Sequence, residues 1–289
     1  MNGILLIDKE PDWTSSDVVV KLKGILRERR IGHAGTLDPM ATGLLVVFVG
    51  RATRAVQFAE SDSKRYRAAL RLGITTDTQD VTGRVTDQKE AYVTEEELEA
   101  ALESFRGDIE QIPPMYSAVQ IGGKRLYDIA RKGGVVERKP RPVTIHELSI
   151  LGHDGDDWLL DVRCSKGTYI RTLCHDIGQM LGCGGCMSAL RRTEAGSFRV
   201  TDAVTIGEVQ RLRDAGEIEK RLLPVDMLFS REKACTASAA EEKRIRCGTD
   251  YHTQLSDGLY RVYSESGDFL MLGSAENDTM KTVKNFFEV

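Results

Sequence analysis

The stretch GHAGTLDPMATGLLVVFVG, residues 32–50, places a glycine- and proline-rich bend directly before a run of apolar residues. Asp38 is the only acidic residue in this stretch, and Pro39 follows it. Irregular backbone is where binding and catalytic side chains concentrate. Aspartate is also a favoured turn residue, because its side chain hydrogen-bonds nearby backbone. The bend alone therefore leaves two interpretations of Asp38, a turn former or a residue of a functional site.

Upstream of the bend, the sequence predicts a short strand and then a helix. Residues 4–7, ILLI, form an apolar run that is typical of a buried strand. Residues 14–17, TSSD, are all good helix N-caps. The helix after them carries apolar residues at helical spacing, and its basic residues lie mostly off that stripe: Lys21, Lys23, Arg27, Arg29 and Arg30. This helix leads straight into the bend.

Downstream, predicted strands alternate with predicted helices. Strands are expected at residues 66–73, 143–151 and 158–164, and helices at 94–106 and 170–181. Thr94 and Glu97 form a capping box for the first of these helices, and Gly107 is expected to end it. The composition changes near residue 230. A short helix at 239–248 and strands at 259–263 and 269–273 then predict a small, mostly β module.

The composition is that of an ordinary globular protein. The 289 residues predict about two domains of roughly 150 residues each. The formal net charge is −4, so the chain lacks the overall basic character of non-specific nucleic-acid binders, although a local basic groove stays compatible with that total. No apolar run reaches the ~18 residues of a spanning helix, and the N-terminus does not resemble a signal peptide. We expect a cytoplasmic protein without membrane contact.

The cysteines do not form a recognisable metal motif. The chain has 6 of them, and only Cys183 and Cys186 are spaced as a pair. A structural zinc site needs four ligands, and His175 is the only nearby candidate for a third. Cytoplasmic thiols are reduced by default. The sequence therefore predicts free thiols and no metal site.

Five segments together resemble the TruB family, the bacterial tRNA pseudouridine-55 synthases. They follow the family's order along the chain: GHAGTLDPMATGLL at 32–45, KRYRA at 64–68, QIPPMYSA at 111–118, CSKGTYIRTL at 164–173 and LRRT at 190–193. The resemblance departs from the family at residues 9–15. The family usually reads Lys-Pro-x-Gly-x-Thr-Ser there, whereas this chain reads KEPDWTS, so the turn geometry of that loop is expected to differ from the family's.

The resemblance implies an α/β (α+β) fold, a mixed, mainly antiparallel pseudouridine synthase core with a small β-rich PUA-like C-terminal domain. The implied division is residues 1–229 for catalysis and 230–289 for RNA binding. The implied reaction isomerises uridine 55 in the T loop of tRNA after the base is flipped out of its stack. It needs no cofactor, and the chain contains neither a Gly-x-Gly-x-x-Gly motif nor a P-loop.

The resemblance also assigns three catalytic residues, Asp38, Tyr66 and Arg171. A carboxylate is ionised at pH 7 without a base, because its ordinary pKa is about 3.9. Burial beside the apolar run would raise the pKa of Asp38, and a permanent cation such as Arg171 would offset that. Tyr66 could stack on uracil and assist proton transfer. Whether Asp38 attacks the ribose or the uracil ring, or stabilises a glycal-type intermediate, stays open.

Further residues are expected to bind the substrate. His33 resembles the family residue that fills the gap left by the flipped base, with proton transfer as the lesser alternative. Tyr169 and Leu190 match positions that line the base pocket, although core packing alone would also explain them. Lys64 and Lys166 are the remaining predicted substrate-binding residues.

Affinity for RNA must come from local positive charge. Lys124 to Arg141 contain seven Lys and Arg against Asp128 and Glu137, a local charge of +5. This stretch belongs to a basic insertion near 111–142, which resembles the family segment that closes on the T arm and is expected to be poorly ordered without RNA. The expected partner is the T stem-loop of tRNA, bound by a monomer without guide RNA.

Two other functions compete with this interpretation. A guide-RNA-dependent synthase related to dyskerin would share much of the aspartate motif, but this chain lacks a long basic tail. An RNA chaperone would need no chemistry, and the intact set of Asp38, Tyr66 and Arg171 argues against that as the sole role.

Overall fold

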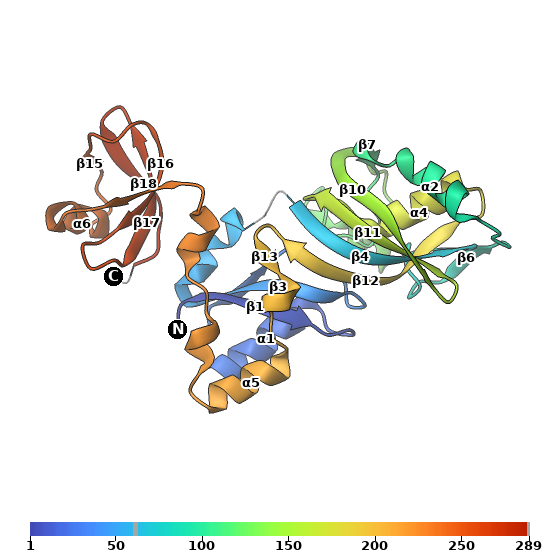
Figure 1. Ribbon diagram of the computed structural model, residues 1–289, viewed down its shortest axis with the longest axis horizontal. Coiled ribbons are helices and arrows are strands. Elements are labelled where there is room, and N and C mark those ends of the chain that lie inside the picture. The colour runs from blue at the N-terminus through green and yellow to red at the C-terminus, as the bar shows by residue number, and fades with distance from the viewer. Residues whose placement is uncertain (60–62, 288–289) are drawn as a thin grey trace.

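A nine-stranded sheet forms the centre of the computed structural model, which describes residues 1–59 and 63–287 (Figure 1). Its main path runs β1-β3-β12-β4-β11-β10-β7, with β2 beside β3 and β13 beside β12. The strands are β1 (Gly3–Lys9), β2 (Ile31–Ala34), β3 (Thr42–Val49), β4 (Ser63–Leu72), β7 (Gly107–Gln111), β10 (Arg141–Asp154), β11 (Asp157–Ser165), β12 (Gly185–Ala195) and β13 (Phe198–Arg199). Among these pairs only β12 and β3 run parallel. The predicted mixed, mainly antiparallel fold is confirmed.

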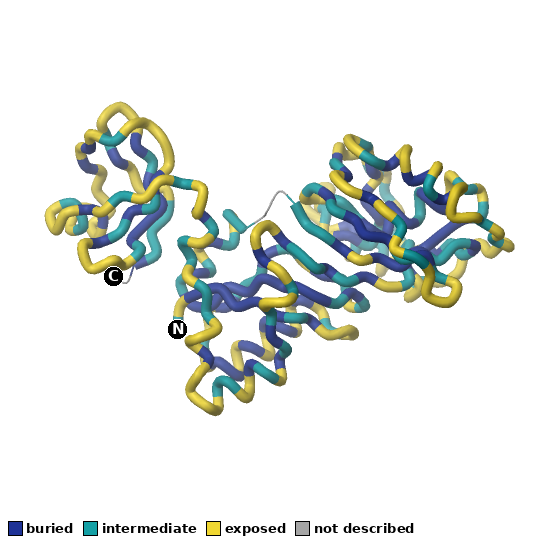
Figure 2. Tube along the Cα trace, in the orientation of Figure 1, coloured by how far each residue is buried: buried dark blue, intermediate teal, exposed yellow. Residues whose placement is uncertain are grey.

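Helices pack on the two halves of this sheet. α1 (Ser15–Leu26) and α5 (Ile206–Asp214) share an apolar cluster with β1 and β3. α2 (Glu95–Glu103) and α4 (Ile170–Met180) share another with β4, β11 and β12. The buried strands appear as the dark centre of each half in Figure 2. The site described below lies where the two halves meet.

The apolar run at 44–49 is buried on both of its faces. Leu45, Val47 and Val49 pack against α1 and α5. The alternate residues of β3 pack against η1 (Gly50–Phe58) and the segment around Phe198. Because side chains of a strand alternate between faces, a strand covered on both sides needs no polar positions.

The predicted helix starts are confirmed. Thr14 caps α1 through a capping box with Asp17, and Thr94 caps α2 through one with Glu97. The predicted end of the second helix is wrong. α2 ends at Glu103, and Gly107, with φ of 82°, begins β7 instead. The opening bend is also shorter than expected, because residues 31–34 pair with β3 as strand β2.

Short elements complete this part of the chain. They are β5 (Ile74–Thr76), β6 (Val85–Gln88), η2 (Val200–Asp202), η3 (Ile218–Arg221) and η4 (Val225–Phe229). In the basic insertion the structure has a hairpin of β8 (Gln120–Ile121) and β9 (Lys124–Arg125), then α3 (Leu126–Ala130). Leu126 is buried, whereas most of the basic side chains are exposed. Its lack of order without RNA stays a prediction.

A second, five-stranded sheet follows residue 232. Its order is β14-β16-β17-β18-β15, and its elements are β14 (Lys233–Thr236), α6 (Ala239–Arg246), β15 (Tyr251–His252), β16 (Gly258–Tyr263), β17 (Phe269–Glu276) and β18 (Thr279–Asn285). The expected small β-rich module is confirmed. Its separation as a domain at 229/230 stays a prediction. Among the described residues, no helix is long and apolar enough to cross a membrane.

Aromatic rings join the two sheets. The ring of Phe229 lies 5.4 Å from Phe58 of η1, 6.1 Å from Phe269 and 6.0 Å from Phe286. Aromatic pairs at such distances stabilise beyond the area they bury. Phe229 is therefore the ring that contacts both sides of the junction.

Replacing Phe229 with Ala should loosen this junction. Phe→Ala in a core costs about 3–5 kcal/mol. We expect lower stability to urea and faster proteolysis around residues 230–232. Leu259→Ala, at a position 39% exposed on β16, is the control. Equal cleavage rates for the two variants would contradict this account of the junction.

Candidate active site

Asp38 and Arg171 form a two-point ion pair. Arg171 Nε lies 3.0 Å from Asp38 Oδ2, and its Nη2 donates to Oδ1 at 3.3 Å. Asp38 lies in the irregular loop between β2 and β3, and Arg171 in the first turn of α4. The Arg171 side chain is 6% exposed and that of Asp38 is 37% exposed. The arginine is thus a fixed internal group, and the carboxylate is reachable from solvent.

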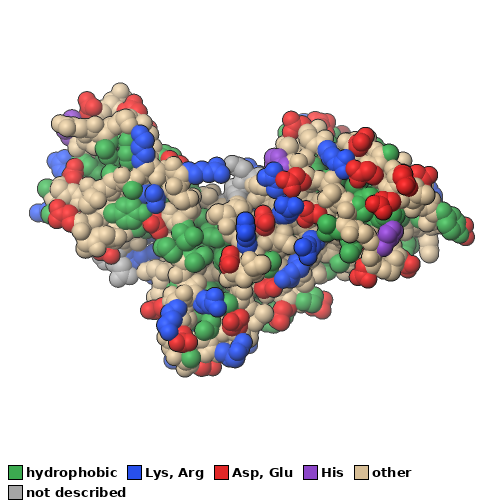
Figure 3. Space-filling model, viewed as in Figure 1, with side chains coloured by type: hydrophobic (Ala, Val, Ile, Leu, Met, Phe, Trp, Pro, Cys, Tyr) green, Lys and Arg blue, Asp and Glu red, His purple; other side chains and the backbone are tan. Residues whose placement is uncertain are grey.

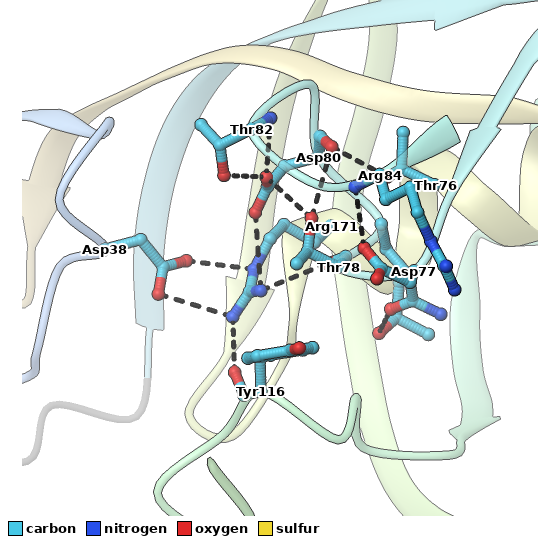
Figure 4. Close-up of polar contacts among 11 residues, drawn as sticks. Asp38, Thr76, Asp77, Thr78, Asp80, Thr82, Arg84, Tyr116 and Arg171 are labelled. Carbon is cyan, nitrogen blue, oxygen red and sulfur yellow. Dashed lines mark hydrogen bonds and ion pairs between the residues drawn. The ribbon is translucent and has the colours of Figure 1, made fainter. Parts of the chain in front are cut away.

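Three further acceptors hold the Arg171 guanidinium in place (Figure 4). Nη1 donates to the Thr78 carbonyl at 3.1 Å and lies 3.4 Å from Asp80 Oδ2. Nη2 also donates to the Tyr116 carbonyl at 2.8 Å. Tyr116 belongs to the insertion, so this segment contacts the same guanidinium that binds Asp38.

Asp80 is a site residue that the sequence analysis missed. It is 4% exposed, and its Oδ1 accepts from the Thr78 hydroxyl at 2.9 Å and from the Thr82 backbone N–H at 3.0 Å. Its sequence context, TTDTQDVTGR at 75–84, looks like an exposed turn. The threonines that flank Asp80 could have indicated that it is buried, because a buried carboxylate needs nearby hydrogen-bond donors such as hydroxyl groups.

The pKa of Asp38 reflects these neighbours. Burial raises the pKa of its carboxyl above the ordinary value, and the positive charge of Arg171 opposes that rise. The negative charge of Asp80 raises this pKa, and Lys9 lowers it. Arg171 is therefore the group that most strongly favours the charged form of Asp38.

Two buried side chains fix the loop that carries Asp38. The Ser15 hydroxyl accepts from the Leu37 N–H at 2.9 Å and donates to the Leu37 carbonyl at 3.2 Å. Lys9, which is fully buried, donates to the Pro39 carbonyl at 3.0 Å. It also donates to carbonyls of its own loop, Glu10 at 2.9 Å and Trp13 at 2.7 Å. The backbone on both sides of Asp38 is thereby held.

The departure from the family pattern at residues 9–15 is accommodated. Asp12 adopts φ of 64°, in the left-handed region that favours glycine but that aspartate tolerates. Its N–H donates to the Pro39 carbonyl at 3.0 Å, so this loop also braces the Asp38 loop. Burial lowers the pKa of Lys9 to about 8.

Tyr66 and Leu190 lie beside Asp38. Both are buried, at 7% and 8% exposure, in the apolar cluster that also contains Leu37. Burial raises the pKa of Tyr66, and Arg192 opposes that rise. Tyr169 caps α4, two residues before Arg171, and the Gln111 side chain fixes it by accepting from its N–H at 2.9 Å.

The other predicted binding residues lie around the loop. His33 is on β2 and partly buried, and its buried Nδ1 has no hydrogen-bond partner among the residues that the structure describes. Burial lowers the pKa of His33, so the ring is neutral at pH 7. A Cβ added at Gly35 would lie 3.4 Å from the Lys64 Cε, which places Lys64 against the start of the loop. Lys166 lies on an exposed turn before α4.

Comparison with known proteins places this arrangement in a family. The family model described as TruB family pseudouridylate synthase (N terminal domain) matches residues 23–170. That described as tRNA pseudouridylate synthase B C-terminal domain matches residues 171–230. The chain belongs to the TruB family. The boundary between the two matches falls inside α4, and β12, which follows it, belongs to the central sheet. The boundary between the two family models therefore does not coincide with a boundary between structural domains.

Curated TruB relatives are similar along nearly the whole chain. The tRNA pseudouridine synthase B of Alkaliphilus oremlandii is 43% identical over 286 residues, 96% of this chain and 94% of that protein. That of Escherichia coli is 38% identical over 290 residues, 96% of this chain and 92% of that protein.

Solved structures share the fold. A chain of an H/ACA RNP bound to a substrate RNA containing 2'-deoxyuridine has a TM-score of 0.73 at 24% identity, over 99% of this chain and 85% of that one. A chain of a Cbf5-Nop10-Gar1 complex has a TM-score of 0.72 at 25% identity, with the same coverage. The pseudouridine synthase fold expected from the sequence is confirmed.

Asp80→Asn should change the pH dependence of the TruB reaction. Removing this negative charge lowers the pKa of Asp38, so the acid limb of the pH–rate profile should move to lower pH. The rate on its plateau should fall about tenfold or more, because Arg171 loses one of its fixed contacts. Single-turnover rates on a tRNA transcript measure both effects, with Asp77→Asn in the same turn as the control. An acid limb that moves to higher pH would refute this account.

Lys9 should make stability depend on pH. Its pKa of about 8 in the folded state lies below the ordinary 10.5, so between these values the unfolded chain binds more protons. The free energy of unfolding contributed by Lys9 therefore rises with pH across this window. In urea unfolding, the free energy of unfolding of wild type should rise relative to that of Lys9→Met from pH 8 to 10.5. A constant difference between the two proteins would mean that burial does not lower the pKa of Lys9.

Proposed function

We propose that this chain isomerises uridine 55 in the T loop of tRNA to pseudouridine. The single observation that carries the proposal is the ion pair between Asp38 and Arg171, set in a chain of the TruB family. In this reaction the bond from ribose C1' to N1 breaks and a bond from C1' to C5 forms. C5 loses a proton and N1 gains one, so nothing is oxidised or reduced.

In this proposal Asp38 acts as the ionised nucleophile or as the anion that stabilises a glycal-type intermediate. Arg171 keeps the carboxylate charged and fixes its direction, since the two-point pairing leaves little freedom of rotation. Tyr66 and Leu190 are proposed to form the apolar wall for the uracil ring, with the Tyr66 hydroxyl relaying a proton. Tyr169 is proposed to line the base site beside Arg171.

The base must leave its stack to reach Asp38, at a cost of a few kcal/mol. A neutral His33 ring with an unpartnered Nδ1 suits insertion into the gap, because it loses little hydration there. Lys64 and Lys166 are proposed to hold the phosphates of the flipped nucleotide. The net negative charge of the chain does not prevent RNA binding, because charges of the two signs are separated on the surface. In Figure 3, Lys and Arg gather over the middle of the face, while acidic side chains crowd one end.

The basic insertion and the second sheet are proposed to hold the rest of the tRNA. Lys124, Arg125, Arg131, Lys132, Lys139 and Arg141 are exposed on the insertion. Residues 230–289 would act as a PUA-like RNA-binding domain. The curated relatives are named as tRNA enzymes, which favours a stand-alone enzyme over a guide-RNA complex. In this proposal the protein acts as a monomer in the cytoplasm.

Incubation with an unmodified transcript labelled with tritium at uridine C5 tests this proposal. Wild type should release tritium from position 55 without guide RNA, and a transcript with cytidine at 55 should yield none. Asp38→Asn should abolish release while it still binds the transcript, and Asp154→Asn, at the exposed end of β10, should behave as wild type. Normal release by Asp38→Asn would exclude Asp38 as the reacting carboxylate. Binding or refolding of tRNA without any release by wild type would favour the chaperone alternative.

A further inference from the structure

Arg192 is a buried cation that the proposed chemistry leaves without a role. It is 1% exposed on β12. Its Nε donates to the Leu44 carbonyl at 2.7 Å, and its Nη2 donates to the Gly35 carbonyl at 2.9 Å. Across the part of the chain that the structure describes, no carboxylate forms an ion pair with it. A buried guanidinium with neutral acceptors is costly, so its contacts merit a functional explanation.

Arg192 also faces Tyr66. The two residues are directly opposite each other where β12 pairs with β4. Side chains at opposed positions of an antiparallel pair have Cβ atoms about 5 Å apart. Both side chains are buried, and the positive charge of Arg192 opposes the rise in the pKa of the Tyr66 hydroxyl. One planar group thus lies beside a predicted catalytic side chain and also binds the backbone at the start of the Asp38 loop.

Two glycines bring the loop against Arg192. Gly35 has φ of 71°, and a Cβ there would lie 3.3 Å from Arg192 Nη1. Gly43 has φ of 95°, and a Cβ there would lie 2.3 Å from the Arg192 carbonyl oxygen. Both ends of the loop that carries Asp38 therefore pack on Arg192 without intervening side chains.

We propose that Arg192 is a positioning residue of the isomerisation: it ties the Tyr66 hydroxyl to the Gly35 carbonyl, so that Tyr66 and Asp38 keep a fixed separation around the uracil ring. This inference rests on the proposed function. Arg192 touches neither the substrate nor Asp38 in this scheme. Lysine, with one point of attachment, cannot replace the planar fork that holds two or three acceptors at once.

Arg192→Lys tests the proposal, with Arg191→Lys as the matched control. Arg191 is the adjacent residue, which pairs with Asp8 at 3.0 Å and 2.7 Å and has a side chain 41% exposed. We expect Arg192→Lys to slow single-turnover tritium release about 100-fold, as displacing a catalytic group by about 1 Å does. The dissociation constant for tRNA should change by less than about threefold in Arg192→Lys. In Arg191→Lys, both the single-turnover rate and the dissociation constant should stay within about threefold of wild type.

Coupling to Tyr66 separates positioning from general stability. In a Tyr66→Phe background the effect of Arg192→Lys should be at least about tenfold smaller, because the hydroxyl that it positions is gone. The basic limb of the pH–rate profile should also move to higher pH in Arg192→Lys alone, since the positive charge that opposes the raised pKa of Tyr66 is displaced. Additive effects in the double variant, or an unmoved basic limb, would overturn the proposal.

A second measurement needs neither RNA nor a folded Arg192 variant. Tyr66→Phe keeps the ring but removes one partner of Arg192, so hydrogen exchange of the peptide containing residues 32–45 should accelerate severalfold. Tyr92→Phe, at a position 86% exposed, is the control. Unchanged exchange would overturn the link between Tyr66 and the loop. If the loop responds but wild type has no activity on tRNA, the proposed function fails while the link between Tyr66 and the loop stands.

Discussion

The ion pair between Asp38 and Arg171 is the interaction on which the site depends. The two residues are 133 positions apart in the sequence. They meet because β12 joins the two halves of the sheet: it pairs with β3 on one side and with β4 on the other. α4, which carries Arg171, packs on that same strand. The loop and the arginine therefore come from separate elements that a single strand brings together, and Leu37 of the loop packs in the same apolar cluster as α4.

The cations of the site and its reactive carboxylate differ in how far they are buried. Lys9, Arg171 and Arg192 are all nearly inaccessible to solvent, whereas Asp38 remains partly open. Each cation satisfies backbone carbonyls, and these carbonyls belong mainly to the loop that carries Asp38 or to segments that brace it. All three cations thus fix the backbone, and Arg171 and Lys9 also favour the charged form of the carboxylate. This double use explains why buried charges, which usually destabilise a fold, are concentrated here.

The sequence was informative where the signal is local. Helix starts need only residues a few positions apart, and both the N-cap candidates at 14–17 and the capping box of Thr94 and Glu97 were predicted correctly. The pairing of Asp38 with Arg171 came from the resemblance to the TruB family, since no periodicity links residues so distant. The sequence did not predict Asp80, Lys9 and Arg192 as buried residues of the site, because each looks like a solvated charge in its own segment. Their burial depends on chain from elsewhere in the fold, which no single-sequence pattern reports. The end of α2 was placed too late because Gly107 begins a strand instead of ending the helix.

The proposed reaction depends on Arg171 favouring the ionised form of a partly enclosed Asp38. Carbon-13 NMR of carboxyl-labelled aspartate measures this ionisation directly, with the Asp38 signal assigned by its loss in Asp38→Asn. We expect a pKa for Asp38 above the ordinary aspartate value in wild type and a further rise in Arg171→Met. An Asp38 pKa that is the same in the two proteins would show that Arg171 does not have this role.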